Sequence, residues 1–130
     1  MKDLFHDLLP ELSIYPASLG AAAKTGDAII DLQGFEGALI IMASGLLTVD
    51  MPFQLMHGDD SALADAAAVP DTDLVNTDPT LLEATDNEIK AMSYVGNKRY
   101  LRIDTTLGTG LAVGIIVKGK ARHGPAAEVA

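Results

Sequence analysis

Apolar and polar residues alternate along much of residues 26–118, which is the pattern of β-strands that bury one face and expose the other. Turn-forming residues, chiefly glycine and asparagine, interrupt the alternation about every 8 to 12 residues. The sequence shows no long amphipathic stretches of helical period, which an α/β fold would need between its strands. The pattern therefore predicts an all-β, single-domain fold, a β-sandwich or jelly-roll-like domain, with strands over residues 28–32, 38–43, 47–57, 80–84, 88–95, 99–105 and 111–117.

Turn chemistry and proline add detail to these strands. The run Gly96–Lys98 predicts a tight hairpin turn between two alternating segments, and Gly108–Gly110 predicts another turn. Pro52 cannot donate a hydrogen bond to a neighbouring strand, so its strand should lie at an edge or carry a bulge. The continuous apolar run 38–43 fits a strand buried on both faces or central in a sandwich, and the alanine-rich residues 62–68 fit a helical turn.

The two ends of the chain differ from the predicted β-domain of residues 26–118. In residues 1–25, leucine and phenylalanine recur at spacings of one, three and four, which predicts a short helix or an arm lying on a neighbour. Tyr15-Pro16 should end that pattern, because the residue before proline avoids helical geometry. Residues 119–130 are polar and rich in glycine and alanine, and we expect an extended tail.

Charge is unevenly distributed along the chain, whose net charge is −9. Ten acidic residues and no lysine or arginine lie between Asp50 and Glu88, whereas seven basic residues and one acidic residue lie between Lys90 and Arg122. The two segments can pair within one chain or between subunits, and the sequence favours neither. Because phosphate contacts need clustered basic residues on a basic protein, we expect no direct reading of nucleic acid.

Candidate catalytic and metal-binding groups are sparse. The three histidines lie far apart, and His57 stands near Asp59 and Asp60 at what we expect to be a polar loop. The acidic residues from Asp59 to Asp78 suggest calcium, but the spacing of an EF-hand loop is missing. No nucleophile elbow, phosphate-binding loop or cysteine is present. We therefore expect neither an enzyme nor a bound cofactor or metal.

The segment 98–102 is the strongest candidate for an interface. Lys98, Arg99, Tyr100 and Arg102 offer large contact areas and planar hydrogen bonding, which protein interfaces favour. The basic end of the chain adds four further candidates, which are Lys118, Lys120, Arg122 and His123. In the alternative reading, Arg99 and Arg102 pair with acidic residues on neighbouring strands of the same chain.

Three segments resemble a known group of proteins. Residues 94–103 read YVGNKRYLRI and are similar to a stretch that recurs in small virion-associated proteins of tailed phages and prophages. Residues 49–60, which end in His-Gly-Asp-Asp, and residues 119–125, which read GKARHGP after an apolar strand, are similar to two other parts of those proteins. The resemblance covers residues 26–125 and leaves residues 1–25 unmatched.

This resemblance implies a structural component of a phage particle, of head decoration, cement or spike-base type. Such a protein would bind the major capsid protein and further copies of itself, as a trimer, pentamer or hexamer on the head surface, after synthesis in the bacterial cytoplasm. The acidic start of the chain predicts no secretion signal, and no apolar run reaches the roughly 18 residues of a membrane-spanning helix.

Two other functions stay open at this stage. The chain could form a head-to-tail connector or a tail-tube ring, in which the acidic residues 57–80 would line a DNA channel. It could also be a carbohydrate- or calcium-binding β-module, although the sequence contains no tryptophan for a sugar platform.

Overall fold

The computed structural model describes residues 7–20, 23–76, 80–82, 86–106 and 108–121. These residues form strands almost throughout, and the predicted all-β, single-domain fold is confirmed. The elements are β1 (Leu8–Leu19), β2 (Ile30–Asp31), β3 (Phe35–Val49), β4 (Met51–Gly58), β5 (Ala67–Ala68), the short 3-10 helix η1 (Asp71–Asp73), β6 (Leu74–Val75), β7 (Thr80–Leu81), β8 (Ile89–Tyr94), β9 (Tyr100–Thr105) and β10 (Thr109–Ala121).

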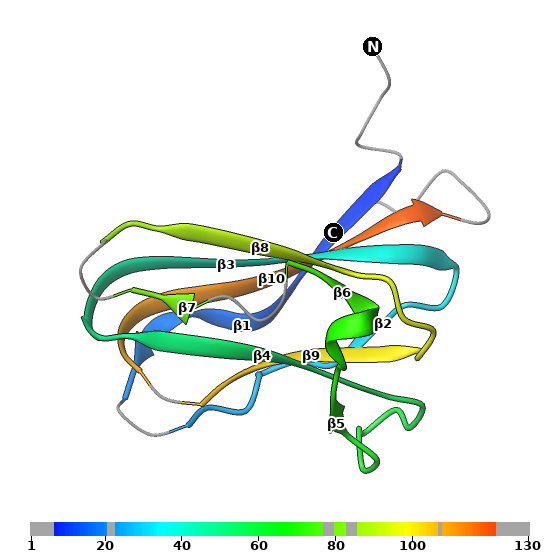
Figure 1. Ribbon diagram of the computed structural model, residues 1–130, viewed down its shortest axis with the longest axis horizontal. Helices are drawn as coiled ribbons and strands as arrows, with labels where there is room; N and C mark the ends of the chain where they lie inside the picture. Colours follow the sequence, from blue (N-terminus) through cyan, green and yellow to red (C-terminus); the bar gives the residue numbers. More distant parts are fainter. Residues whose placement is uncertain (1–6, 21–22, 77–79, 83–85, 107, 122–130) are drawn as a thin grey trace.

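The strands form two antiparallel sheets that lie one above the other (Figure 1). The first sheet has the order β1-β10-β3-β8-β6. The second sheet has the order β2-β9-β4-β5, and β7 pairs with β4 beside it. Consecutive strands often lie in different sheets: the chain crosses between the two sheets after β1, β2, β3, β5, β8 and β9.

The hydrophobic core lies between the two sheets. Alternation is regular in β4, where Met51, Phe53 and Leu55 are buried and the residues between them are partly exposed. Ile40 and Met42 on β3 face them from the first sheet with no exposed surface. Full burial of each such side chain contributes about 1.5–3 kcal/mol, so this layer supplies most of the drive for the two sheets to pack.

A bulge in β1 links the two sheets by hydrogen bonds. The register of β1 on β10 shifts between Leu12 and Ile14, and Ser13 is fully buried there. The Ser13 hydroxyl accepts a hydrogen bond of 2.9 Å from the Ile103 N–H on β9 and donates one of 3.1 Å to the Ala28 carbonyl. The bulge thus gives hydrogen-bond partners to the Ile103 N–H and the Ala28 carbonyl, which neither sheet pairs by itself.

The prediction of a short helix near the N-terminus was wrong for residues 8–19, which form the edge strand β1. The alternative of an arm lying on a neighbour stays a prediction. Pro10 and Pro16 fit in this strand because one side of an edge strand needs no hydrogen-bond donors. Residues 1–6 lie outside the described residues. The predicted tail is also shorter than expected, because β10 continues through residue 121.

Two predicted turns differ from the structure. Residues 95–99 do not close a hairpin, because β8 belongs to the first sheet and β9 to the second. Likewise, the turn before β10 carries the chain back to the first sheet. The alanine-rich residues 62–68 form turns and the short strand β5 in place of a helical turn.

Candidate functional site

The predicted interface segment 98–102 comprises the end of the connection that crosses from the first sheet to the second and the start of β9. The backbone of this connection is held on both sides: the Val95 N–H donates to the Asp73 carbonyl at 2.8 Å, and the Leu32 N–H donates to the Arg99 carbonyl at 2.8 Å. The Lys98 N–H donates to the Tyr94 hydroxyl at 3.0 Å. These bonds fix the direction in which the side chains of residues 97–99 leave the surface.

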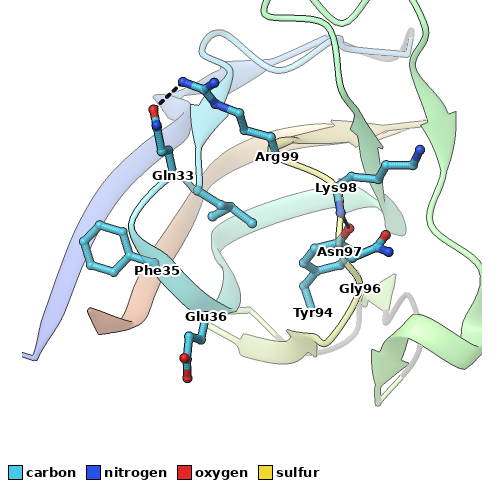
Figure 2. A pocket seen from close by; sticks show the side chains of 9 residues that line it. Gln33, Phe35, Glu36, Tyr94, Gly96, Asn97, Lys98 and Arg99 are labelled. Atoms are coloured by element: carbon cyan, nitrogen blue, oxygen red, sulfur yellow. Dashed lines mark hydrogen bonds between the residues drawn. The ribbon is translucent and has the colours of Figure 1, made fainter. Parts of the chain in front are cut away.

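A shallow hollow of about 260 Å³ lies beside this connection. One wall is the turn between β2 and β3, with Gln33, Phe35 and Glu36, and the other wall is residues 96–99 (Figure 2). In Figure 2 the Arg99 side chain reaches toward Gln33, whereas Lys98 points away from the hollow. The hollow therefore presents a mixed lining of two aromatic rings, amides and charged groups.

Arg99 is engaged within the chain. Its guanidinium donates two hydrogen bonds of 2.9 Å to the two carboxylate oxygens of Asp31 and a further one to Gln33. It also lies 5.1 Å from the centre of the Tyr100 ring. The bond from Arg99 lowers the pKa of Asp31, and the same contact raises the pKa of Arg99. Both side chains stay close to half exposed to solvent.

Lys98 and Arg102 also have carboxylate partners in the same chain. The Lys98 ammonium lies 2.9 Å from Asp59, and this hydrogen bond raises the pKa of Lys98. Arg102 pairs with Asp104 two residues along β9, at 2.7 and 2.9 Å. The structure thus contains the intrachain pairs of the alternative reading, although Arg102 pairs along its own strand. Whether this surface also binds a partner stays a prediction.

The basic end of the chain lies in two different settings. Lys118 is buried between the sheets, where its ammonium donates to the Asp31 carbonyl at 3.2 Å and contacts Glu11 and the Phe35 ring. The Lys118 ammonium therefore binds groups of its own chain. The Lys120 side chain and residues Arg122 and His123 lie outside the described residues.

The acidic and basic segments meet within the chain at Lys98–Asp59 and at Lys90–Glu88. Other acidic side chains of residues 59–65 organise their own loop: Asp60 accepts bonds from the N–H groups of residues 62 and 64, and Asp65 accepts from those of residues 59 and 60. Among the residues that the structure describes, no group of three or more histidine, aspartate or glutamate side chains is placed to hold a metal ion.

A buried polar pair escaped the sequence analysis. His57 Nδ1 lies 3.0 Å from the Tyr94 hydroxyl, and the two rings meet edge to face at 5.8 Å. His57 is on β4 and Tyr94 on β8, so the pair joins the two sheets beneath the crossing connection. Burial lowers the pKa of His57 and raises that of Tyr94. No sequence signal connects two residues 37 positions apart, and the nearby acidic residues directed attention to the loop.

The outer faces of the two sheets differ in chemistry. On the second sheet the outward positions include Tyr100, Arg102 and Asp104 on β9 and Gln54 on β4. On the first sheet the outward positions of β1, β10, β3 and β8 form what we call the uncharged face, which consists of Pro10, Leu12, Val113, Ile115, Val117, Leu39, Ile41, Ala43, Ile89, Ala91 and Ser93. The run 38–43, predicted as buried on both faces or central in a sandwich, supplies three of these residues, so it is buried on one face only and lies in β3 at the centre of the first sheet.

A solvated sheet face normally carries polar side chains, and large exposed apolar patches mark interaction sites. Leu12 is 40% exposed, Leu39 42% and Ile89 66%. In the sequence, the signal for this face is the consecutive apolar residues of the predicted strands 38–43 and 111–117. The structure places these residues side by side, in β3 and β10. The uncharged face is therefore a second candidate site, which the sequence analysis missed.

No helix in the described part of the chain is long and apolar enough to cross a membrane.

No protein family and no curated protein sequence matched the chain. Among solved structures, its fold is similar to the crystal structure of the SPBc2 prophage-derived protein YomS, with a TM-score of 0.59 over 88% of this chain and 94% of that chain. The two sequences are 12% identical, so the likeness concerns the fold alone.

Proposed function

We propose that this chain is a structural subunit of a tailed-phage particle, which binds the capsid surface as a symmetric homo-oligomer and catalyses no reaction. The observation that carries the proposal is the uncharged outer face of the first sheet, because a chain of net charge −9 gains from such a face only when a protein covers it. The fold shared with a prophage-derived protein supports a phage origin, as does the sequence resemblance of residues 94–103.

In this proposal the two outer faces have separate tasks. The uncharged face supplies the apolar area that holds copies together. The surface of Lys98, Arg99, Tyr100 and Arg102 supplies polar complementarity and an aromatic anchor toward the major capsid protein. Because the three basic side chains are already held by carboxylates, they meet a partner with little further loss of side-chain entropy.

The first test locates the protein on particles. Phage particles that encode the chain are labelled with a gold-conjugated antibody against it and imaged by electron microscopy. Label over the head shell is the expected result. Label confined to the neck or tail would favour the connector or tail-tube function, and intact particles without label would overturn both.

The second test concerns the capsid-facing surface. We expect the double variant Tyr100→Ala, Arg102→Ala to fold normally but to load onto particles at reduced occupancy. Tyr15→Ala removes an exposed tyrosine from β1 in the first sheet and should load like the wild type. Wild-type occupancy of the double variant would show that this surface is not the interface.

A further inference from the structure

The uncharged face is continuous across the first sheet because of its register. One row across the strands reads Leu12, Ile115, Ile41 and Ala91. The next row reads Pro10, Val117, Leu39 and Ser93, and a third reads Val113, Ala43 and Ile89. No position in these rows carries a charge, so their members form a single patch.

The face has relief as well as apolar character. Small residues such as Ala17, Ala43 and Gly45 line a hollow of about 400 Å³ beside Leu111. A second hollow of about 220 Å³ lies at Pro10, Leu12 and Ile115, next to Glu11, whose carboxylate pairs with Lys118. Larger side chains such as Leu39 and Ile89 project from the same face. A surface with both projections and hollows can receive a surface of the same shape.

The patch is large enough for the centre of an interface. With strands about 4.8 Å apart and about 3.3 Å per residue, four strands over the length of residues 111–117 cover about 440 Å² in projection. A standard interface takes about 800 Å² from each partner, of which the apolar centre is one part and a polar rim the other. The uncharged face therefore matches the centre of a stable dimer contact.

We infer that the uncharged face binds the same face of a second copy, so that two chains pack sheet against sheet about a two-fold axis. In an isologous contact each copy presents the surface that the other needs, and a surface without charges can face itself without repulsion. The loop between β4 and β5 lies on the side of the second sheet, away from this face (Figure 1). The inference rests on the homo-oligomer of the proposed function and names its contact; because the second sheets then lie on opposite sides of the dimer, one copy of each dimer faces the capsid.

Sedimentation equilibrium tests the contact with the full-length chain and two matched variants. Leu39→Lys places a charge on the uncharged face, and Gln54→Lys places the same charge on the outer face of the second sheet. We expect wild type and Gln54→Lys to associate as dimers, or as assemblies built from dimers. Leu39→Lys should raise the dissociation constant at least about 100-fold, because two lysines per dimer would be buried without partners. Unfolding curves of each variant show whether its monomer is folded.

A wild-type chain that sediments as a 13.6 kDa monomer at every concentration would overturn the inference. The chain's own ends or a different protein would then cover the uncharged face. Equal association of wild type and folded Leu39→Lys would also overturn it. These outcomes are independent of particle labelling: a dimer that breaks with Leu39→Lys but never labels particles would contradict only the proposed function. Labelled particles with a monomeric purified chain would contradict only the dimer contact.

Discussion

At the scale of single residues, the Tyr94 hydroxyl satisfies two buried groups at once. It accepts a hydrogen bond from the Lys98 N–H, which leaves its own proton free to be donated to His57 Nδ1. Tyr94→Phe keeps the ring but leaves both groups without this partner, so we expect a loss of about 1–3 kcal/mol in the free energy of unfolding. Urea unfolding measures the loss, and Tyr15→Phe, which removes an exposed hydroxyl, should change it little. Equal effects of the two variants would contradict this role.

The same pair makes stability depend on pH. Burial, the largest cause, lowers the pKa of folded His57 below its usual 6.5, so the unfolded chain binds this proton first as pH falls. Above pH 6.5, neutral His57 makes its full contribution to the free energy of unfolding. Below pH 6.5 this contribution falls by at most about 1.4 kcal/mol per pH unit, until the pH reaches the pKa of His57 in the folded chain. The lowered pKa of Asp31 acts in a separate window, below 3.8. Unfolding curves at a series of pH values give the free energy of unfolding, which should change less steeply with pH in His57→Gln than in the wild type. An equally steep change in the variant would assign the pH dependence to other groups.

At the scale of elements, the start of β10 depends on a glycine. Gly110 has φ +139°, lies between two register shifts of β10 on β3, and leaves no room for a Cβ, which would lie 2.3 Å from the Leu46 carbonyl oxygen. Gly110→Ala should therefore cost about 1–3 kcal/mol of stability. Gly37→Ala in β3 is the matched control, because a Cβ there meets nothing within 4 Å. Thermal unfolding of both variants checks the difference, and similar midpoints would show that the bulge adjusts.

Alternation predicted the strands that have one buried and one exposed face, which are β4, β8 and β9, because burial imposes a period of two on the sequence. It failed for β1, an edge strand whose prolines and closely spaced leucines resemble the end of a helix. Gly96–Lys98 has the composition of a hairpin turn, but local residues do not determine whether the next strand pairs with the previous one or crosses to the other sheet.

The candidate site was predictable to a similar degree. The outward direction of the basic and aromatic residues on β9 followed from alternation, and carboxylate partners for the basic residues were anticipated as a class. The partners themselves, such as Asp31 for Arg99, depend on strand order, which the sequence left open. The uncharged face depends on it too, because apolar residues from β1, β3 and β10 become one surface only when these strands are neighbours.

At the scale of the whole molecule, salt separates the two ways in which copies can associate. If the acidic and basic segments paired between subunits, salt would screen the attraction and weaken association. In the face-to-face contact the joined surfaces are uncharged, and the remaining long-range term is repulsion between two chains of net charge −9. We therefore expect the dimer dissociation constant to fall severalfold between about 0.01 M and about 1 M NaCl, as the screening length drops from about 30 Å to about 3 Å. Sedimentation equilibrium across this range measures it, and a dissociation constant that rises with salt would assign the contact to ion pairs.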